Sequence, residues 1–314
     1  MNRPSIAIVG AGRAGTALGR ALHAAGYPVV AVHSLSPTSA ARLATHTGAQ
    51  VTGTAIAAVR AADLTLLTVP DGAIVQIGAT LAATGMALRD HALLHCSGAQ
   101  SREALSATRQ LGAAVGVCHP LQALTRDADA DLLRGTYFGV DADDRLRPVV
   151  ERMVSDLGGV PFAVPGGDRA LYHAAAVLAG NAPLALLDRA AQLLVDAGVD
   201  PAVAGPALAG LLEGAARNAR RLGVSAALTG PVVRDDAATV ARHLDALRGD
   251  QQTQRLYYRL ARETLRAAGS TGRPRVSELL ARPAPSRAAT REARGERALV
   301  PAPRRAPAQQ LATR

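Results

Sequence analysis

The sequence predicts an α/β protein in which a doubly wound parallel sheet is followed by an all-α domain. Three observations support this class: short apolar runs alternate with helical stretches in the first half, a glycine-rich turn follows the first run, and the strand pattern stops near residue 165. We therefore divide the chain into an α/β domain over residues 1–165, a helical domain over 166–282 and a tail over 283–314.

The first half consists of predicted strands that alternate with helices. The apolar run over 6–9 is typical of a strand covered on both faces, and the amphipathic helix after it ends at Gly26. Because parallel strands need crossover connections, this alternation predicts right-handed β-α-β units. Further strands are expected over 28–34, near 51 and in the segments that end near 70, 97 and 119. Two more strands are expected over 136–140 and 160–164, and helices over 38–48 and 144–158.

The second half contains long helical stretches and no strand pattern. Helices are expected over about 168–197, 201–222, 236–247 and 251–268, separated by turns that contain glycine. From residue 283 the chain consists largely of Pro, Ala and Arg, which bury little apolar area. We therefore expect the basic tail over 283–314 to be disordered.

Charge and hydropathy argue against nucleic-acid and membrane partners. The formal net charge is +10, but residues 270–314 hold ten Arg and three Glu, so most of the excess lies in this C-terminal stretch. No aromatic residues alternate with the basic ones, as a stacking platform for bases would require. The longest apolar helical run is interrupted by Asn181, Pro183 and Asp188, which predicts that it does not span a membrane.

The cysteines and the absence of lysine limit the chemistry. Cys96 and Cys118 lie in apolar runs, which favours reduced thiols, and no signal-peptide pattern precedes the first strand; we expect a cytoplasmic location. No spacing typical of metal ligands is present. Because the sequence contains no lysine, proton transfer depends on His, Asp, Glu, Tyr or a water that these groups hold.

The turn "GAGRAG" places Gly10, Gly12 and Gly15 in the spacing GxGxxG between a strand and a helix. Gly10 permits a tight turn, Gly12 lets the backbone approach a pyrophosphate, and Gly15 allows the helix to pack closely on the strand. The first N–H groups of the helix, from Arg13 and Ala14 onward, can then bind phosphate. In this context the motif predicts a Rossmann-type, dinucleotide-binding domain.

The end of the second strand favours NADP over NAD. An NAD site needs an acidic residue about 20 positions after the glycine motif, and "HSLSPTSAAR" contains none. Ser34 and Ser36 can donate hydrogen bonds to a 2′-phosphate, and Arg42 can pair with it.

Two further strand ends are expected to border the nicotinamide, because ligands of open parallel sheets lie outside the carboxyl ends of the strands. These ends supply Val69 and Pro70 from "TVPD", and Ser97 and Gly98 from "HCSG". The alternative interpretation is that both are ordinary turns in which Asp71 and Ser97 cap helices.

The segment "VCHPLQAL" brings His119 to the same edge of the sheet. Pro120 restricts the backbone of His119 to extended conformations, which fixes the direction of the imidazole. A fixed imidazole beside a cofactor can bind a carboxylate or donate a proton, with Gln122 as a nearby amide for the substrate. A turn histidine that hydrogen bonds to the backbone is the alternative.

The stretch "YHAAAVLAGNAPLALL" contains two candidate catalytic residues, His173 and Asn181, which lie about 80° apart around a helix. Pro183 predicts a kink near Asn181, because it cannot donate to the carbonyl of Ala179. A kink with an amide beside an apolar wall is a candidate substrate pocket. The alternative is that both side chains make only local contacts.

Arg234, in "LTGPVVRDD", is a candidate for binding a substrate carboxylate. It lies at the start of a predicted helix, where a cation is unfavourable beside the helix dipole, and so an anionic partner is expected. A salt bridge to Asp235 or Asp236 accounts for the residue equally well.

The motifs "GAGRAG", "VPD", "CSGA", "HPLQ", "YHAAAVLAGN" and "LTGPVVRDD" resemble those of bacterial Rossmann-like proteins with a C-terminal helical domain of unknown function. More widely, the chain resembles ketopantoate reductases, pyrroline-5-carboxylate reductases and 6-phosphogluconate-type dehydrogenases, and "HPLQ" resembles prephenate dehydrogenases. This resemblance implies an NADP domain and a helical domain that forms a homodimer and closes the site. The family's lysine on the first long helix is absent, and His173 and Asn181 occupy that region.

These observations together lead us to expect an NADP-dependent oxidoreductase that reduces a small carbonyl or imine, with ketopantoate implied only by the resemblance. His119 or His173 would supply a proton, Asn181 would hold the reacting oxygen, and Arg234 would bind a carboxylate. The alternatives are a prephenate-dehydrogenase-like enzyme and a non-catalytic NADP-binding sensor or scaffold.

Overall fold

The computed structural model describes residues 3–124, 130–164, 168–269 and 271–281. It divides into two compact units, Met1–Leu184 and Ala185–Arg314, each of which is described by itself. The domain boundary expected between 165 and 166 stays a prediction. The tail over 283–314 and the Pro165-Gly166-Gly167 segment lie outside the described residues.

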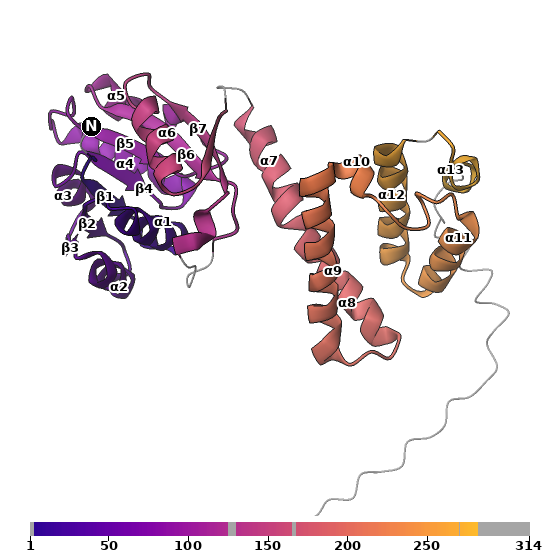
Figure 1. Cartoon of the computed structure of the whole chain (residues 1–314). Helices are drawn as coiled ribbons and strands as arrows, with labels where there is room; N and C mark the ends of the chain where they lie inside the picture. The colour runs from indigo at the N-terminus through magenta and orange to yellow at the C-terminus, as the bar shows by residue number, and fades with distance from the viewer. Residues whose placement is uncertain (1–2, 125–129, 165–167, 270, 282–314) are drawn as a thin grey trace, which may run out of the picture. The chain divides into compact units, whose positions relative to one another are not determined.

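In the described part of the first unit, eight strands form one sheet in the order β3-β2-β1-β4-β5-β6-β7-β8 (Figure 1). This mostly parallel sheet confirms the predicted α/β class. The strands are β1 (Ile6–Val9), β2 (Val29–His33), β3 (Gln50–Val51), β4 (Leu64–Leu67), β5 (Ala92–His95), β6 (Ala114–Pro120), β7 (Tyr137–Ala142) and β8 (Val160–Ala163).

Helices cover both faces of the sheet, as the doubly wound class predicts. Leu22, Leu43 and Val150 belong to one buried core, whereas Val59 and Ile74 belong to a second one. The first face is covered by α1 (Arg13–Ala24), α2 (Pro37–Thr47) and α6 (Arg147–Asp156). The second is covered by α3 (Ala55–Arg60), α4 (Asp71–Ala83), the short helix η1 (Arg102–Leu105) and α5 (Ser106–Gln110).

The pairing of β6 with β7 is antiparallel, which departs from the all-parallel sheet expected. The connection between these strands contains only the short helix η2 (Ala130–Leu133) in its described part. A parallel return needs a long crossover, usually a full helix, so a chain without one comes back antiparallel. The strand pair β7 and β8, which α6 connects, is parallel again.

Parallel pairing places the candidate residues of the first unit at one edge. Val9, Leu67, His95 and Val117 lie in register across β1, β4, β5 and β6. β6 continues past this line, where its partner is β7 and His119 is paired with Gly139. His119 is therefore held in a strand beyond the point where the neighbouring strands end.

The long helix expected over 168–197 is broken at Asn181 into α7 (Arg169–Gly180) and α8 (Ala182–Asp196). This agrees with the kink that Pro183 predicts. By length and composition alone, the stretch Arg169–Asp196 is the one candidate membrane span among the described residues, and it contains an 18-residue window with a mean hydropathy of 1.4. A single stretch of this kind is weak evidence for a membrane.

The second unit is helical. Its core contains Val232, Val240, Tyr258 and Val276. The helices are α9 (Pro201–Leu222), α10 (Val224–Ala227), α11 (Ala237–Ala246), η3 (Leu247–Gly249), α12 (Gln251–Ala268) and α13 (Pro274–Ala281). α10 and α13 were not expected from the sequence, because both are too short to show a clear period.

The two aspartates of "RDD" have separate roles. Asp236 caps α11 by accepting from the N–H of Thr239 at 3.0 Å. Asp235 has a positive φ of 57° and is buried, and its carboxylate accepts from the N–H of Val276 at 2.8 Å and from Nε of Arg275 at 3.1 Å. The ion pair of Asp235 is therefore with Arg275, and Arg234 is exposed.

Candidate active site

The glycine turn after β1 has the geometry that the GxGxxG motif predicts. Gly10 has a φ of 105°, and a Cβ there would lie 2.7 Å from the carbonyl oxygen of Thr68. A Cβ on Gly15 would collide with the carbonyl oxygen of Gly10 and lie 2.5 Å from Oγ1 of Thr68. Both positions therefore require glycine for the packing of the turn itself.

Gly12 differs from the other two, because no heavy atom lies within 4 Å of the position of a Cβ. It is the N-cap of α1, and no side chain caps this helix. The first N–H groups of α1, from Arg13 onward, thus face an open space at the positive end of a helix dipole, which suits a pyrophosphate. The residues present fit a dinucleotide.

Thr68 is a residue that the sequence reasoning missed. Its hydroxyl donates to the carbonyl oxygen of Gly10 at 2.6 Å and thereby holds the turn against the end of β4. The next residue, Val69, also contacts this turn, since its Cγ1 lies 2.9 Å from the position of a Cβ on Gly10. Thr68 could have been predicted from its place as the first residue of "TVPD", directly before Val69 and Pro70.

The two serines proposed to bind the 2′-phosphate lie just after β2. Ser36 is the N-cap of α2 and accepts from the N–H of Ser39 at 3.3 Å. Ser34 accepts from the N–H of Ser36 at 3.4 Å. Both hydroxyl protons are free of these bonds, so each serine can still donate to a phosphate. The choice between NADP and NAD stays a prediction.

His119 contacts α7 at the carboxyl edge of the sheet. Its Nδ1 lies 2.9 Å from Oη of Tyr172, and the two rings meet edge to face at 5.6 Å between centroids. The ring of His173 lies 6.0 Å from that of His119. The structure therefore brings together two of the predicted catalytic residues, and it adds Tyr172, which the sequence reasoning missed.

Gly98 provides the space for this histidine pair. A Cβ at Gly98 would lie 2.6 Å from Nδ1 of His173 and 2.9 Å from Nε2 of His119. The neighbouring Ser97 is buried and fixes the turn, because its Oγ accepts from the N–H groups of Ala99 and Gln100 at 3.1 and 3.0 Å. The interpretation of Ser97 as a helix cap is therefore wrong, since Ser97 fixes a turn and Ser101 is the N-cap of the next helix, η1.

Burial sets the protonation of this cluster. Loss of hydration lowers the pKa of His119 to about 4, with further lowering from the nearby His173 and Arg169. Loss of hydration also raises the pKa of the Tyr172 hydroxyl. Both shifts favour the uncharged form of each group near neutral pH.

Arg169, at the start of α7, was also missed by the sequence reasoning. It is buried, its Nε donates to the carbonyl oxygen of Gln100 at 3.1 Å, and its guanidinium lies 5.2 Å from the centroid of the Tyr172 ring. Among the described residues, its two terminal nitrogens have no hydrogen-bond partner, and neither does Nδ1 of His173. Unsatisfied buried donors are rare in native proteins and are typical of functional positions.

The remaining predicted catalytic and substrate-binding residues of the first unit do not join this cluster. Gln122 and Asn181 are exposed, and within the described chain neither makes a hydrogen bond or ring contact with His119 or His173. Pro70 is the N-cap residue of α4. Arg234 belongs to the second unit. Their proposed roles stay predictions.

We predict that burial of His119 makes the stability depend on pH. Its pKa is 6.5 when exposed and about 4 when folded, so the unfolded state binds more protons between these values. The free energy of unfolding should therefore fall as the pH decreases from 6.5 to 4, by roughly 3 kcal/mol at most, and this stability is fully present above pH 6.5.

Urea unfolding at pH 7 and pH 4.5 tests this prediction. His119→Gln should lose less stability across the interval than the unaltered protein. His46→Gln, at an exposed position on α2, is the matched control and should keep the original dependence. Equal losses in the unaltered protein and in His119→Gln would contradict the prediction.

Comparison with known proteins identifies both halves of the chain. A model of a Rossmann-like domain matches residues 1–120, and a model of a domain of unknown function, DUF2520, matches residues 136–264. The chain joins a Rossmann-like domain to a DUF2520 domain. This confirms the resemblance to Rossmann-like proteins with a helical domain of unknown function. No curated protein matches the chain.

Several solved structures are similar to this chain over most of its length. A Bacteroides fragilis protein provisionally described as an NADP oxidoreductase has a TM-score of 0.67 at 25% identity, over 83% of this chain and 97% of that one. An imine reductase from Pseudomonas sp. has a TM-score of 0.61 at 22% identity, over 89% and 99%. A pyrroline-5-carboxylate reductase from Coxiella burnetii has a TM-score of 0.57 at 16% identity, over 85% of this chain and 98% of that one. At these identities, the similarity to the imine reductase and to the pyrroline-5-carboxylate reductase shows the fold alone.

Proposed function

We propose that this protein is an NADP-dependent oxidoreductase that reduces a small carbonyl or imine substrate. The observation that supports this most directly is the glycine turn. Protein atoms occupy the space beside Gly10 and Gly15, whereas the space beside Gly12 is open. The uncapped start of α1 next to that space offers the N–H groups that a pyrophosphate requires.

The residues of the first unit would hold the cofactor along the carboxyl edge. Backbone N–H groups from Arg13 to Gly15 would bind the pyrophosphate, and Ser34 and Ser36 would donate to the 2′-phosphate. When bound, NADPH supplies the hydride for the reduction. Val69, Pro70, Ser97 and Gly98 are the residues proposed to border the nicotinamide.

His119 would act as a neutral hydrogen-bond donor. Since the raised pKa of Tyr172 keeps its hydroxyl protonated, that hydroxyl would donate to Nδ1 of His119, which leaves the ring proton on Nε2. Nε2 lies on the side of Gly98, at the carboxyl edge. An N–H held there stabilises negative charge that develops on a substrate oxygen.

The substrate would carry a carboxylate. Arg169 is a buried cation whose terminal nitrogens lack partners among the described residues, so its positive field favours an anion near the histidine pair. Arg234 and Gln122 are further candidates for binding the carboxylate, and Asn181 for holding the reacting oxygen. Ketopantoate and cyclic imino acids both have this chemistry.

Loss of NADPH absorbance over a panel of 2-keto acids and cyclic imines tests the proposal. We expect turnover of at least one compound, with kcat/KM lowered by ~100-fold or more in His119→Ala. The exposed His46→Ala is the control and should keep full activity. NADPH bound without turnover of any compound would favour a sensor, and no affinity for either nicotinamide dinucleotide would overturn the proposal.

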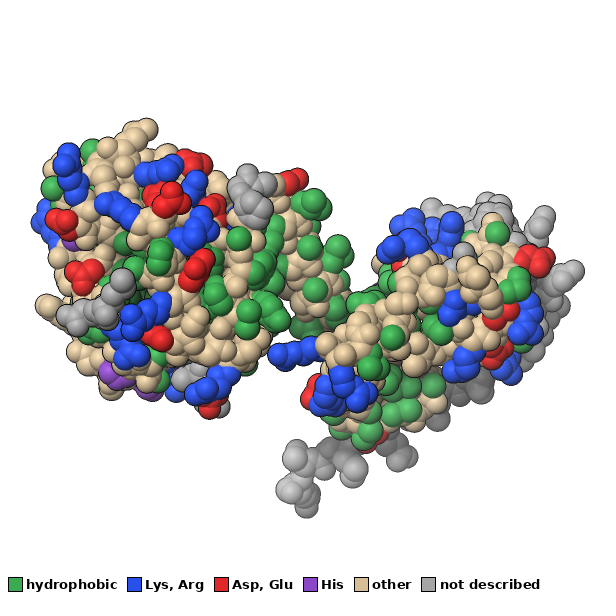
Figure 2. Space-filling view, turned by 45° about the horizontal axis from the view of Figure 1, so that its top comes forward, with side chains coloured by type: hydrophobic (Ala, Val, Ile, Leu, Met, Phe, Trp, Pro, Cys, Tyr) green, Lys and Arg blue, Asp and Glu red, His purple; other side chains and the backbone are tan. Residues whose placement is uncertain are grey.

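We also propose that the protein is a homodimer. Leu178 on α7 and Leu211 on α9 each leave 69% of their surface exposed, and none of the apolar window within Arg169–Asp196 is buried. Figure 2 shows hydrophobic side chains gathered on the surface of this helical region. Exposed apolar surface of this extent on helices is typical of interfaces between subunits.

We predict that light scattering after size exclusion gives twice the chain mass of 32.1 kDa. Because a charge buried in an apolar interface is costly, the double variant Leu178→Asp, Leu211→Asp should give the mass of one chain. Leu35→Asp, at an exposed position in the first unit, is the control. A single-chain mass for the unaltered protein would contradict the prediction.

A further inference from the structure

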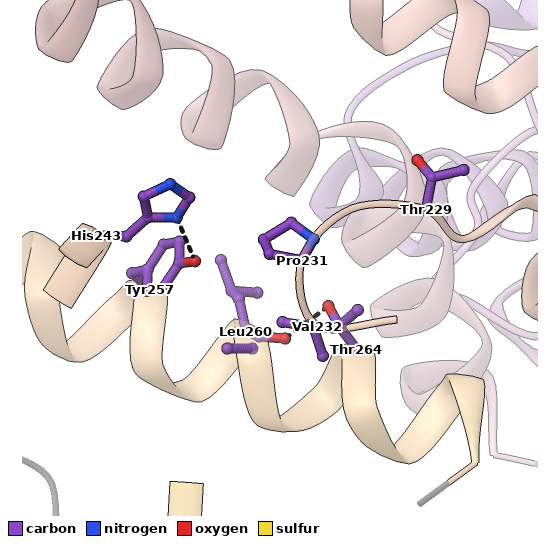
Figure 3. Close-up of a pocket in the computed structure, with 8 residues that line it drawn as sticks. Thr229, Pro231, Val232, His243, Tyr257, Leu260 and Thr264 are labelled. Atoms are coloured by element: carbon purple, nitrogen blue, oxygen red, sulfur yellow. Dashed lines mark hydrogen bonds between the residues drawn. The ribbon is translucent and has the colours of Figure 1, made fainter. Parts of the chain in front are cut away.

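The second unit contains a cavity of about 370 Å³ that the proposed reaction does not use. That volume lies within the range of about 300–1,000 Å³ typical of small-molecule sites. Residues of a single unit form it: the loop before α11, α11 itself and one face of α12 (Figure 3). Its lining residues are Thr229, Pro231, Val232, His243, Tyr257, Leu260, Ala261 and Thr264.

The walls are mostly apolar, and polar groups are few. Pro231, Val232, Leu260 and Ala261 supply hydrocarbon surface, and among the described residues no Asp, Glu or Arg lines the cavity. The hydroxyl of Thr264 is already engaged, since it donates to the carbonyl oxygen of Leu260 at 2.9 Å. An ionised ligand would lose its hydration here without meeting an opposite charge among these residues, which is costly.

His243 is oriented by Tyr257. Its Nδ1 lies 2.8 Å from Oη of Tyr257, and the rings meet edge to face at an interplanar angle of 85°. Burial raises the pKa of the Tyr257 hydroxyl, so this hydroxyl stays protonated and can donate to Nδ1. The ring proton of a neutral His243 then lies on Nε2, the nitrogen that Figure 3 shows turned away from Tyr257.

Thr229 provides a second donor at the other end of the cavity. Figure 3 shows it on the loop, on the far side of Pro231 from His243. Its hydroxyl has no side-chain hydrogen bond within the described chain. Two donors separated by an apolar floor suit a ligand with a hydrocarbon body and an uncharged oxygen acceptor.

We propose that this cavity binds a small neutral molecule that carries a carbonyl oxygen, with Nε2–H of His243 as its donor and the Thr229 hydroxyl as a second contact. This inference does not depend on the proposed oxidoreductase activity, because every residue that it uses belongs to the second unit. It gives the DUF2520 domain a binding function of its own.

Methyl-detected NMR titration of the full chain with cyclohexanone tests the proposal. We expect shifts at Val232 and Leu260, with the affinity lowered ~10-fold in His243→Ala, since one hydrogen bond of about 1.4 kcal/mol is lost. Tyr257→Phe keeps the ring packing but removes the group that sets the tautomer, and should weaken binding ~3-fold. His46→Ala is the control.

Charged analogues of cyclohexanone, and NADPH, distinguish binding in this cavity from binding elsewhere on the protein. Cyclohexylamine and cyclohexanecarboxylate have the same ring with a charged group, and both should bind at least ~10-fold more weakly than cyclohexanone. Saturating NADPH or the His119→Ala change should leave the titration unaltered. Shifts confined to the surroundings of His119, tighter binding of either charged probe, or no response to His243→Ala would each overturn the proposal.

Discussion

Gly12→Ala is expected to weaken NADPH binding ~100-fold while it changes the free energy of unfolding by less than about 1 kcal/mol. The reason is that the space beside Gly12 is open in the protein, so a methyl group there meets nothing until the pyrophosphate arrives. Isothermal titration with NADPH and urea unfolding measure the two effects on the same sample.

Gly15→Ala should behave differently, although it lies in the same motif. Its methyl group would collide with the carbonyl oxygen of Gly10, so we expect a loss of about 1–3 kcal/mol of stability as well as of cofactor binding. Gly214→Ala, at an open position on α9, is the control for a methyl group added elsewhere. If Gly12→Ala bound NADPH with unaltered affinity, the turn would not be a pyrophosphate site.

Gly98→Val is expected to lower kcat/KM ~100-fold on the substrate that the NADPH screen identifies, because displacement of reacting groups by about 1 Å has effects of this size. The added Cβ would lie 2.6 Å from Nδ1 of His173 and 2.9 Å from Nε2 of His119, so both imidazoles must move. Steady-state kinetics at saturating NADPH measure the effect.

A matched change on α7 provides the control for Gly98→Val. Gly180→Val places the same side chain at the end of the helix that holds His173, where no heavy atom lies within 4 Å. It should leave kcat/KM within ~3-fold of the original, an effect of about 0.7 kcal/mol. Equal losses in the two variants would show that the histidine pair is not the reason for the effect of Gly98→Val.

The sequence was sufficient for features that depend on local spacing. The glycine turn follows from residue type alone, because a φ of 105° at Gly10 suits glycine and the packing at Gly15 excludes a Cβ. The break at Asn181 follows from Pro183, which cannot donate a backbone hydrogen bond. The strand order was not needed for either prediction.

The expected parallel pairing of the strands also allowed some of the site residues to be predicted. Since the carboxyl ends of parallel strands share an edge, Ser97, Gly98 and His119 could be expected close to the glycine turn. The antiparallel β7, which holds His119 beyond that edge, was not predicted, because strand direction depends on the path of the connection and not on the strand's own pattern.

By itself, the sequence determined the α/β class, the cofactor turn and the candidate histidines. Only the tertiary structure decided which side chains meet: it places Tyr172 against His119 and Arg169 against Tyr172, and it leaves Asn181 exposed. The physical reason is that α7 follows the last strand of the sheet in the chain, and helical period fixes which of its residues share a face but not which strand end that face contacts.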